Sequence, residues 1–181
     1  MRALLLSLLR DHSYREGEFT LASGKTSRFY VDVRRTSLTA EGAAAIGALL
    51  FDELTATGWD FSGAGGMTLG ADPLATAVAI TSFQRGTPLA SFIVRKETKE
   101  HGAGRQIESA GTLAAGARVV VLDDTITTGG STLRAVEAMR DAGYVVVGAA
   151  CIVDRLEGGR ELLQANGVPM VSLFTLSDLA V

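Results

Sequence analysis

Two adjacent carboxylates at the end of an apolar run are the residues of this sequence with the clearest chemical potential. Asp123 and Asp124 follow the run RVVVL and precede a segment rich in hydroxyl groups and glycine, 125–132. The apolar run predicts a strand buried on both faces, and ligands bind at the carboxyl ends of strands in open parallel sheets. Two adjacent carboxylates repel each other, so placing them together costs free energy unless another group compensates their negative charge. We therefore expect this pair to hold the hydroxyls of a sugar or a divalent cation.

The turn after the two carboxylates predicts an anion-binding site. Its small residues, 125–131, would let successive backbone N–H groups converge on a phosphate at the start of a helix. Two other phosphate-binding motifs do not fit. Gly130 is followed by Ser131 and not by the lysine of a Walker A loop, and GAGRQI lacks the last glycine of a dinucleotide fingerprint. Helix capping alone would explain the Asp pair taken by itself, whereas the whole string favours a phosphate cradle.

A long charged segment, RKETKEHGAGRQIE at 95–108, is the second candidate for chemistry. A solvated helix is the simpler interpretation, but Gly102 and Gly104 would interrupt it. Ordering fourteen residues costs about 14–28 kcal/mol, far more than the burial of its one large aliphatic side chain returns. We expect a mobile lid that closes over a polyanion. The cations that would face this ligand are Arg95, Lys96, Lys99, Arg105 and, when protonated, His101.

The elements that must position these residues alternate between strand and helix. The expected strands are 29–35, 61–66, 88–94, 118–124, 144–153 and 169–175, and the expected helices are 1–10, 39–56, 73–80, 131–141 and 159–166. Asp72 and Pro73 are predicted to be the N-cap and first residue of the third helix. Such alternation predicts an α/β fold with a mostly parallel central sheet flanked by helices. A length of 181 residues suits one domain.

Composition excludes several classes of protein. A net charge of −3 argues against a general nucleic-acid surface. No uncharged apolar run reaches the length of about 18 residues that a membrane span needs, and the opening MRALLLSLLR lacks a signal cleavage site. The single cysteine, Cys151, lies in an apolar stretch and is expected to be a buried small side chain. These features favour a cytoplasmic protein that binds small polar ligands.

Four motifs carry a resemblance to a known family. VVVLDDTITTGGST, 119–132, resembles the phosphoribosyl pyrophosphate (PRPP) motif of type I phosphoribosyltransferases, and segment 95–108 resembles the mobile catalytic loop of the orotate branch. FTLASGKTSRFYVD, 19–32, is similar to the N-terminal segment of that branch, and 153–155 to its arginine near the pyrimidine. The matches occur in family order over nearly the whole chain.

The resemblance implies a role for each matching residue. Asp123 and Asp124 would hold the ribose hydroxyls, and Lys99 and His101 would be catalytic with them. PRPP would also contact Lys25, Arg95, Lys96, Thr125, Ile126, Thr127, Thr128, Gly129, Gly130, Ser131 and Thr132. Orotate would contact Lys25, Phe29, Tyr30, Thr127 and Arg155.

The resemblance also implies a reaction and an assembly. Ribose 5-phosphate would pass from PRPP to orotate, giving orotidine 5'-monophosphate and pyrophosphate in pyrimidine synthesis, with Mg2+ held mainly by PRPP. A homodimer would share its active sites, and a small N-terminal hood, about 1–35 with part of the C-terminus, would cover them. A salvage enzyme for purines or uracil and a non-catalytic PRPP-binding regulator remain alternatives. Some family members carry a lysine in the turn at 65–73 that reaches PRPP, and this chain has none there.

Overall fold

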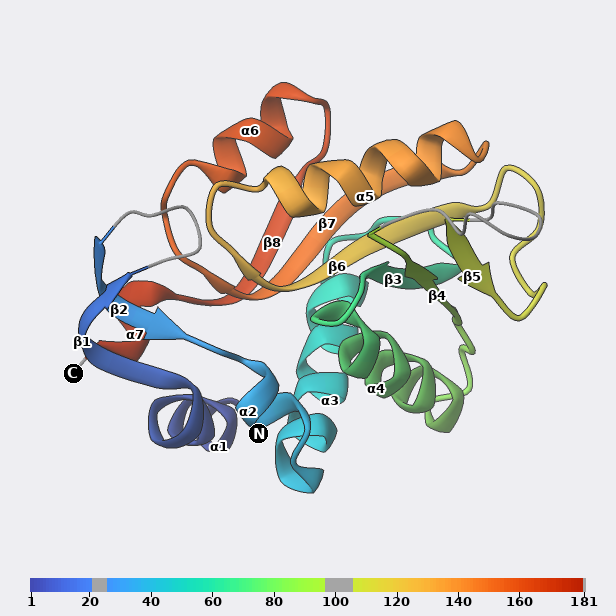
Figure 1. The fold of residues 1–181 in the computed structure, drawn as a ribbon. Helices are drawn as coiled ribbons and strands as arrows, with labels where there is room; N and C mark the ends of the chain where they lie inside the picture. The colour runs from blue at the N-terminus through green and yellow to red at the C-terminus, as the bar shows by residue number, and fades with distance from the viewer. Residues whose placement is uncertain (21–25, 97–105, 181) are drawn as a thin grey trace.

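A six-stranded sheet forms the centre of the molecule (Figure 1). The structure is a computed structural model that describes residues 1–20, 26–96 and 106–180. The spatial order is β5-β4-β3-β6-β7-β8, in which neighbouring strands are parallel except for the antiparallel edge pair β4–β5. The strands are β3 (Gly63–Met67), β4 (Ala90–Val94), β5 (Ile107–Ser109), β6 (Arg118–Ile126), β7 (Val145–Asp154) and β8 (Met170–Thr175).

Helices cover both faces of the sheet, because the central strand is apolar on both sides. Val120 and Leu122 of β6 pack into the core beneath α3 (Ala40–Ala56) and α4 (Ala71–Gln84). Val119 and Val121 point the other way, into the core beneath α5 (Gly130–Asp141) and α6 (Gly159–Ala165). All four valine and leucine side chains are fully buried. The predicted α/β class, with helices flanking a mostly parallel sheet, is confirmed.

The N-terminal segment adds a small layer beside the carboxyl edge of the sheet (Figure 1). Helix α1 (Arg2–Leu8) runs into a π-helical turn, η1 (Leu9–Ser13), and then into the antiparallel hairpin β1 (Tyr14–Thr20) and β2 (Thr26–Val31). The short helices α2 (Arg34–Ser37) and α7 (Leu176–Leu179) complete this layer. Arg2 and Arg10 donate hydrogen bonds to the backbone oxygens of Leu173 and Asp178, which ties the two ends of the chain together.

Several local predictions differ from the structure. The strand expected at 29–35 ends at Val31, and Arg34 begins α2; its partner β1 was not predicted, because YREGEFT is polar and lacks apolar alternation. Asp72 was expected to cap α4, but the helix begins two residues earlier than expected, at Ala71, and Gly70 is the N-cap. Gly70 already has helical angles, so Asp72 falls within the first turn. Within the described residues, no helix combines the length and apolar character needed to cross a membrane.

Candidate active site

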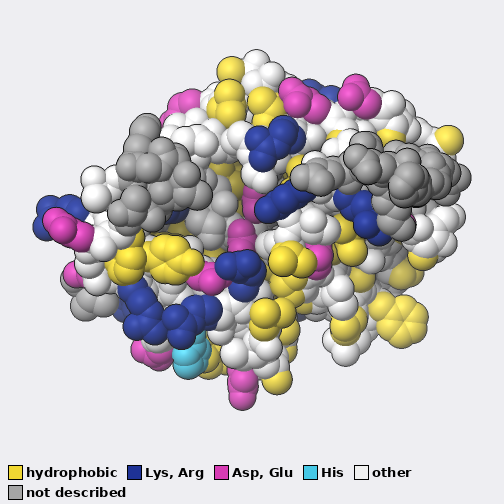
Figure 2. Space-filling model, in the orientation of Figure 1, with side chains coloured by type: hydrophobic (Ala, Val, Ile, Leu, Met, Phe, Trp, Pro, Cys, Tyr) yellow, Lys and Arg dark blue, Asp and Glu magenta, His cyan; other side chains and the backbone are white. Residues whose placement is uncertain are grey.

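The carboxyl ends of three neighbouring strands meet the N-terminal layer at a cavity of about 300 Å3. We call it the central cavity. Figure 2 shows acidic and basic side chains gathered around a hollow on this face of the molecule. Strands β3 and β6, the second residue after β4, the start of α5, and the β2–α2 segment all contribute to it. The lining residues are Tyr30, Val31, Asp32, Arg34, Met67, Thr68, Leu69, Gly70, Lys96, Asp123, Asp124, Thr125 and Ser131.

Asp123 is the more deeply buried of the two predicted carboxylates. Its Oδ2 accepts a hydrogen bond of 2.6 Å from the hydroxyl of Thr132, and its Oδ1 accepts one of 3.0 Å from the N–H of Asp124. Burial raises the pKa of Asp123 from 3.8 to about 7, although the hydroxyl of Thr132 works in the opposite direction. The acid is thus held in one orientation by the first turn of α5.

Asp124 lines the central cavity next to Asp123. Its Oδ1 accepts a hydrogen bond of 2.7 Å from the N–H of Thr125. Burial raises the pKa of the Asp124 carboxyl, while that hydrogen bond and the nearby charge of Arg34 lower it. A Cβ on Gly70 would lie 2.8 Å from Cγ of Asp124, so only glycine leaves room for this carboxylate. Both members of the Asp pair therefore line the central cavity.

The residues of the predicted anion cradle lie in the turn between β6 and α5. Gly129 caps α5 with φ 80°, a left-handed angle that favours glycine. A Cβ at this position would lie 3.0 Å from the backbone oxygen of Gly159, whose own N–H donates to the oxygen of Thr127. The N–H groups of the first turn of any α-helix lack partners within the helix. The start of α5, with Ser131 in the cavity wall, can therefore donate to a phosphate.

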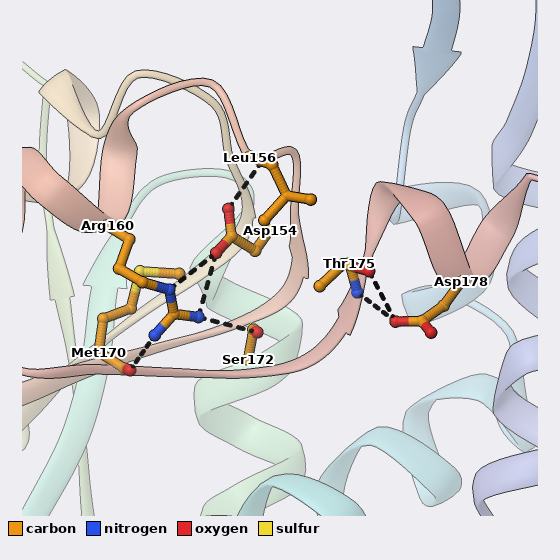
Figure 3. A network of polar contacts seen from close by, with 7 residues as sticks. All are labelled: Asp154, Leu156, Arg160, Met170, Ser172, Thr175 and Asp178. Atoms are coloured by element: carbon orange, nitrogen blue, oxygen red, sulfur yellow. Dashed lines mark hydrogen bonds and ion pairs between the residues drawn. The ribbon is translucent and has the colours of Figure 1, made fainter.

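The turn after β7 is fixed by a buried polar network (Figure 3). Asp154 is 1% exposed, and its Oδ1 accepts from the N–H of Leu156 at 2.9 Å. Arg160 donates to Oδ2 of Asp154 from Nε and Nη2, at 3.2 and 3.1 Å. The same guanidinium reaches the backbone oxygen of Met170 and the hydroxyl of Ser172 on β8. This network holds residue 155, between Asp154 and Leu156, in a fixed position.

Arg155 links the sheet to the N-terminal hairpin. Its Nη2 donates to Oγ of Ser27 at 3.2 Å and pairs with Glu157 at 2.7 Å. Its Nε is buried and has no partner among the described residues. Ser27 in turn donates to the backbone oxygen of Phe29 at 2.8 Å. The structure therefore brings Arg155 and the aromatic strand β2 together.

The two predicted aromatic residues lie on opposite faces of β2, because successive side chains of a strand alternate. Phe29 stacks on Tyr14 with ring centroids 6.0 Å apart, and Tyr30 tilts against Phe19 at 5.5 Å. Tyr30 lines the central cavity. Phe29 lies on the face of β2 that carries Ser27 and so faces the side of Arg155.

The charged segment begins at the rim of the cavity. Lys96 lines the cavity, whereas Arg95 pairs with Glu108 at 2.7 Å. The N–H of Arg95 donates to the oxygen of Gln106 at 2.8 Å, so the two ends of the predicted lid lie side by side. Ile107 and Glu108 belong to β5 rather than to a loop. Three predicted site residues lie outside the described residues: Lys25, Lys99 and His101.

The cavity also contains residues that sequence reasoning missed. Asp32 and Arg34 line it from the N-terminal layer. The turn of Thr68 and Leu69, which are joined by a cis peptide, lines it from the end of β3 and belongs to the 65–73 turn that the sequence already associates with PRPP. The signal for the first pair was present in VDVRR, but the alternation of that run favoured a strand. Of the remaining predicted contacts, Ile126 is buried, so only its backbone can face a ligand, and Thr128 is exposed.

The pKa of Asp123 generates a prediction about stability. The folded protein holds this proton up to about pH 7, whereas the unfolded chain releases it near 3.8. Because the folded state binds more protons in this window, the free energy of unfolding falls as pH rises through it. Asp123→Asn keeps both hydrogen bonds, since the amide nitrogen can donate to Thr132. We expect the variant to lose less stability than the original protein between about pH 5 and pH 8 in urea unfolding. Equal losses in the two proteins would contradict the assignment.

Known proteins share both the sequence and this geometry. Residues 67–165 match the phosphoribosyl transferase domain family. The chain is 48% identical to the orotate phosphoribosyltransferase of Sorangium cellulosum, over 98% of this chain and 92% of that protein. Two structures of the Mycobacterium tuberculosis orotate phosphoribosyltransferase are similar over 99% of each chain. One is a complex with Fe(III) dicitrate (46% identity, TM-score 0.85) and the other a complex with PRPP (43% identity, TM-score 0.81). With such similarity over nearly its full length, the chain belongs to the orotate phosphoribosyltransferase family of type I phosphoribosyltransferases.

Proposed function

We propose that the protein transfers ribose 5-phosphate from PRPP, bound in the central cavity, to N1 of orotate, as expected for this family. The observation that carries the proposal is the pairing of two buried carboxylates with the open N-terminus of α5. Asp123 and Asp124 accept hydrogen bonds from the two ribose hydroxyls, and the backbone of residues 127–131 donates to the 5'-phosphate. A phosphorylated sugar is the ligand class that needs both groups at this spacing along the chain.

The chemistry that these residues support is electrostatic. The bond between C1' of the ribose and the pyrophosphate oxygen breaks, and a bond between N1 of orotate and C1' forms. Positive charge develops on the ribose ring and negative charge on the departing pyrophosphate. Lys96 at the cavity rim stabilises the leaving group, and one such well-placed donor is worth about 3–4 kcal/mol. Arg155 binds the carboxylate of orotate and so orients N1.

A magnesium ion fits this site when PRPP supplies most of its ligands. The described residues contain no group of three side chains that would hold a metal alone. Mg2+ characteristically binds through one or two carboxylates, waters and substrate phosphates, and Asp123 and Asp124 offer carboxylate oxygens at the cavity. When bound with PRPP, the ion would neutralise part of the pyrophosphate charge.

The remaining residue roles rest on the sequence motifs. Lys99 and His101 would reach the pyrophosphate from the lid, and Lys25 would lie at the junction of the base and PRPP. The pairing of Arg95 with Gln106 supports a lid whose two ends are held together at the edge of the sheet. Closure of such a lid excludes water, which would otherwise hydrolyse the activated ribose.

The proposed single domain includes a hood made by residues 1–35 and part of the C-terminus. The hydrogen bonds of Arg2 and Arg10 to the C-terminal segment support this grouping, as does the contact of Arg155 with Ser27. A cytoplasmic location is consistent with the buried, unpaired thiol of Cys151.

We further propose that the protein forms a homodimer through an apolar groove beside the active site. The groove has a volume of about 850 Å3 and lies between the α2 region and α4. It shares Asp32, Arg34 and Leu69 with the central cavity, so an occupant would border the active site. Figure 2 shows hydrophobic side chains beside the hollow of the central cavity. The large apolar side chains exposed in or near the groove are Leu38 (75%), Leu69 (67%), Ile80 (54%) and Phe83 (75%).

A second copy of the chain is the occupant that this position favours. Shared active sites require the partner to reach the cavity, and the groove is continuous with it. Exposed apolar patches of this kind mark interfaces in proteins that otherwise have polar surfaces.

Substrate choice tests the proposed reaction directly. With PRPP and Mg2+ present, we expect the protein to consume orotate, followed by its ultraviolet absorbance, and to leave adenine, hypoxanthine and uracil unchanged. Consumption of a purine or of uracil instead would favour the salvage alternative. Binding of PRPP in calorimetry without turnover of any base would favour the non-catalytic regulator.

Replacement of Arg155 separates the two substrates. Arg155→Gln removes a charge-assisted hydrogen bond to orotate, so the KM for orotate should rise about 10- to 100-fold. The KM for PRPP should change by no more than about twofold, because the cradle on α5 is untouched. Initial rates measured against each substrate give both values. A matching rise in both KM values would show that Arg155 acts on the structure of the site rather than on orotate.

The oligomeric state tests the groove. We expect sedimentation to give a dimer for the original protein and a smaller species for Ile80→Asp, because a charge in the interface must lose its water. Leu4→Asp is the control, since Leu4 is an exposed apolar residue of α1 (44% exposed) and lies outside the groove. A dimer that persists in Ile80→Asp, or one that dissociates equally in both variants, would place the interface elsewhere.

A further inference from the structure

The charge of PRPP poses a question that the family motifs do not answer. PRPP carries a phosphate and a diphosphate, and it must enter a cavity whose floor already holds two carboxylates. The turn GGMTLGADP lacks the lysine with which some family members reach PRPP. Of the side chains that line the central cavity in the described part of the chain, two are cationic, Lys96 and Arg34. Arg34 belongs to none of the sequence motifs used above.

Arg34 is held at the cavity by its neighbour Asp32. The Nε and Nη2 groups of Arg34 donate to Oδ1 and Oδ2 of Asp32 at 2.8 and 3.0 Å. The backbone N–H of Arg34 also donates to Oδ1, at 3.2 Å, because α2 begins here. A guanidinium has five N–H donors, and this paired geometry uses two of them. Three donors on a pre-oriented cation therefore remain for a ligand.

The position of Arg34 points to one part of PRPP. It lines the cavity together with Asp124, the turn at Leu69 and Gly70, and Lys96. The 5'-phosphate is assigned to the α5 cradle, and orotate to the side of Arg155, which does not line this cavity. With the ribose hydroxyls on the Asp pair, the remaining anionic group is the diphosphate. Guanidinium groups bind such oxygens in a two-pronged geometry that a lysine cannot match.

We propose that Arg34 binds the diphosphate of PRPP and supplies the positive charge that the 65–73 turn lacks, with Asp32 as its positioning residue. The inference rests on the proposed function, in which PRPP occupies the central cavity. Asp32 fixes the guanidinium before the ligand arrives, so less side-chain freedom is lost on binding. The Asp32 carboxylate also keeps Arg34 from pairing with Asp124. Without Asp32, the guanidinium would pair with the Asp124 carboxylate.

Three probes separate this role from an indirect one. PRPP contains the diphosphate, inorganic pyrophosphate is the diphosphate alone, and ribose 5-phosphate lacks it. For Arg34→Gln, calorimetry with Mg2+ should show binding of PRPP and of pyrophosphate weakened about 10- to 100-fold. Ribose 5-phosphate should bind within about twofold of the original protein, because it uses the Asp pair and the α5 cradle. The KM for orotate should also be unchanged.

Two further variants sharpen the experiment. Arg85→Gln is the matched control, because Arg85 is another exposed arginine paired with an aspartate, Asp52, and it lines neither the cavity nor the groove. Thr68→Lys, added to Arg34→Gln, places a cation on the turn that lacks one, at a residue that lines the central cavity but not the groove, and should recover most of the lost pyrophosphate affinity. Asp32→Asn should weaken pyrophosphate binding less than Arg34→Gln does, because the cation remains but is less well oriented.

Each alternative has its own outcome. Equal losses for ribose 5-phosphate and pyrophosphate would mean that Arg34 acts only through the charge of Asp124, and would overturn the proposal. Unchanged pyrophosphate binding in a folded Arg34→Gln protein, as judged by thermal unfolding, would also overturn it. Failure of the original protein to bind PRPP would instead refute the proposed function, independently of Arg34.

Discussion

The active site depends on burying two adjacent carboxylates at the end of the central strand. Removing such groups from water is costly, and burial raises the pKa of both Asp123 and Asp124. The surrounding elements reduce this cost through hydrogen bonds, from Thr132 to Asp123 and from Thr125 to Asp124. Since Thr132 lies in α5, the same contact that satisfies the acid also fixes the helix whose N-terminus is the proposed phosphate cradle. The proposed sugar-binding and phosphate-binding parts of the site are therefore mechanically linked.

Close packing of the backbone makes room for this arrangement. Strand β3 is GAGGM, and a Cβ on Gly65 or Gly66 would lie 1.9 or 2.0 Å from a backbone oxygen of the neighbouring strands. At Gly70 the side chain of Asp124 occupies the space that a Cβ would need. The absence of side chains along β3 and its turn thus brings the turn directly against the acid pair. A lysine-free turn is accommodated here because the cation comes from the N-terminal layer instead.

Sequence reasoning succeeded where one segment carries the whole signal. The run from Val119 to Thr132 contains the buried strand, the acid pair, the glycine turn and the helix start, and each could be predicted from local propensities. Helix α4 shows the limit of such reasoning. Asp72 and Pro73 look like a cap and a first residue, yet α4 begins at Ala71, and its N-cap Gly70 packs against Asp124, more than fifty residues away. The periodicity of apolar residues along a segment contains no information about contacts with residues far away in the sequence.

The N-terminal layer shows a second limit. Strand β1 is polar, so the pattern gave no reason to expect it, and its stability comes from pairing with β2 and from the stacking of Tyr14 on Phe29. The strand that was predicted ran through Arg34, because VDVRR alternates as a strand does. Asp32 accepts the N–H of Arg34, an interaction across two residues that favours a helical turn and competes with extended structure.

That local hydrogen bond has a consequence for the whole site. In an extended strand, the side chains of residues 32 and 34 would project from the same face of the sheet, at a separation set by the strand. Because the chain turns at Asp32, the guanidinium folds back onto the carboxylate and meets the cavity. The strand pattern gave no reason to place Arg34 at the site, whereas the turn at Asp32 brings it to the cavity proposed to bind PRPP. A sequence in which Asp32 and Arg34 both persist while the 65–73 turn gains a lysine would have no need of this cation, and its Arg34 should tolerate replacement.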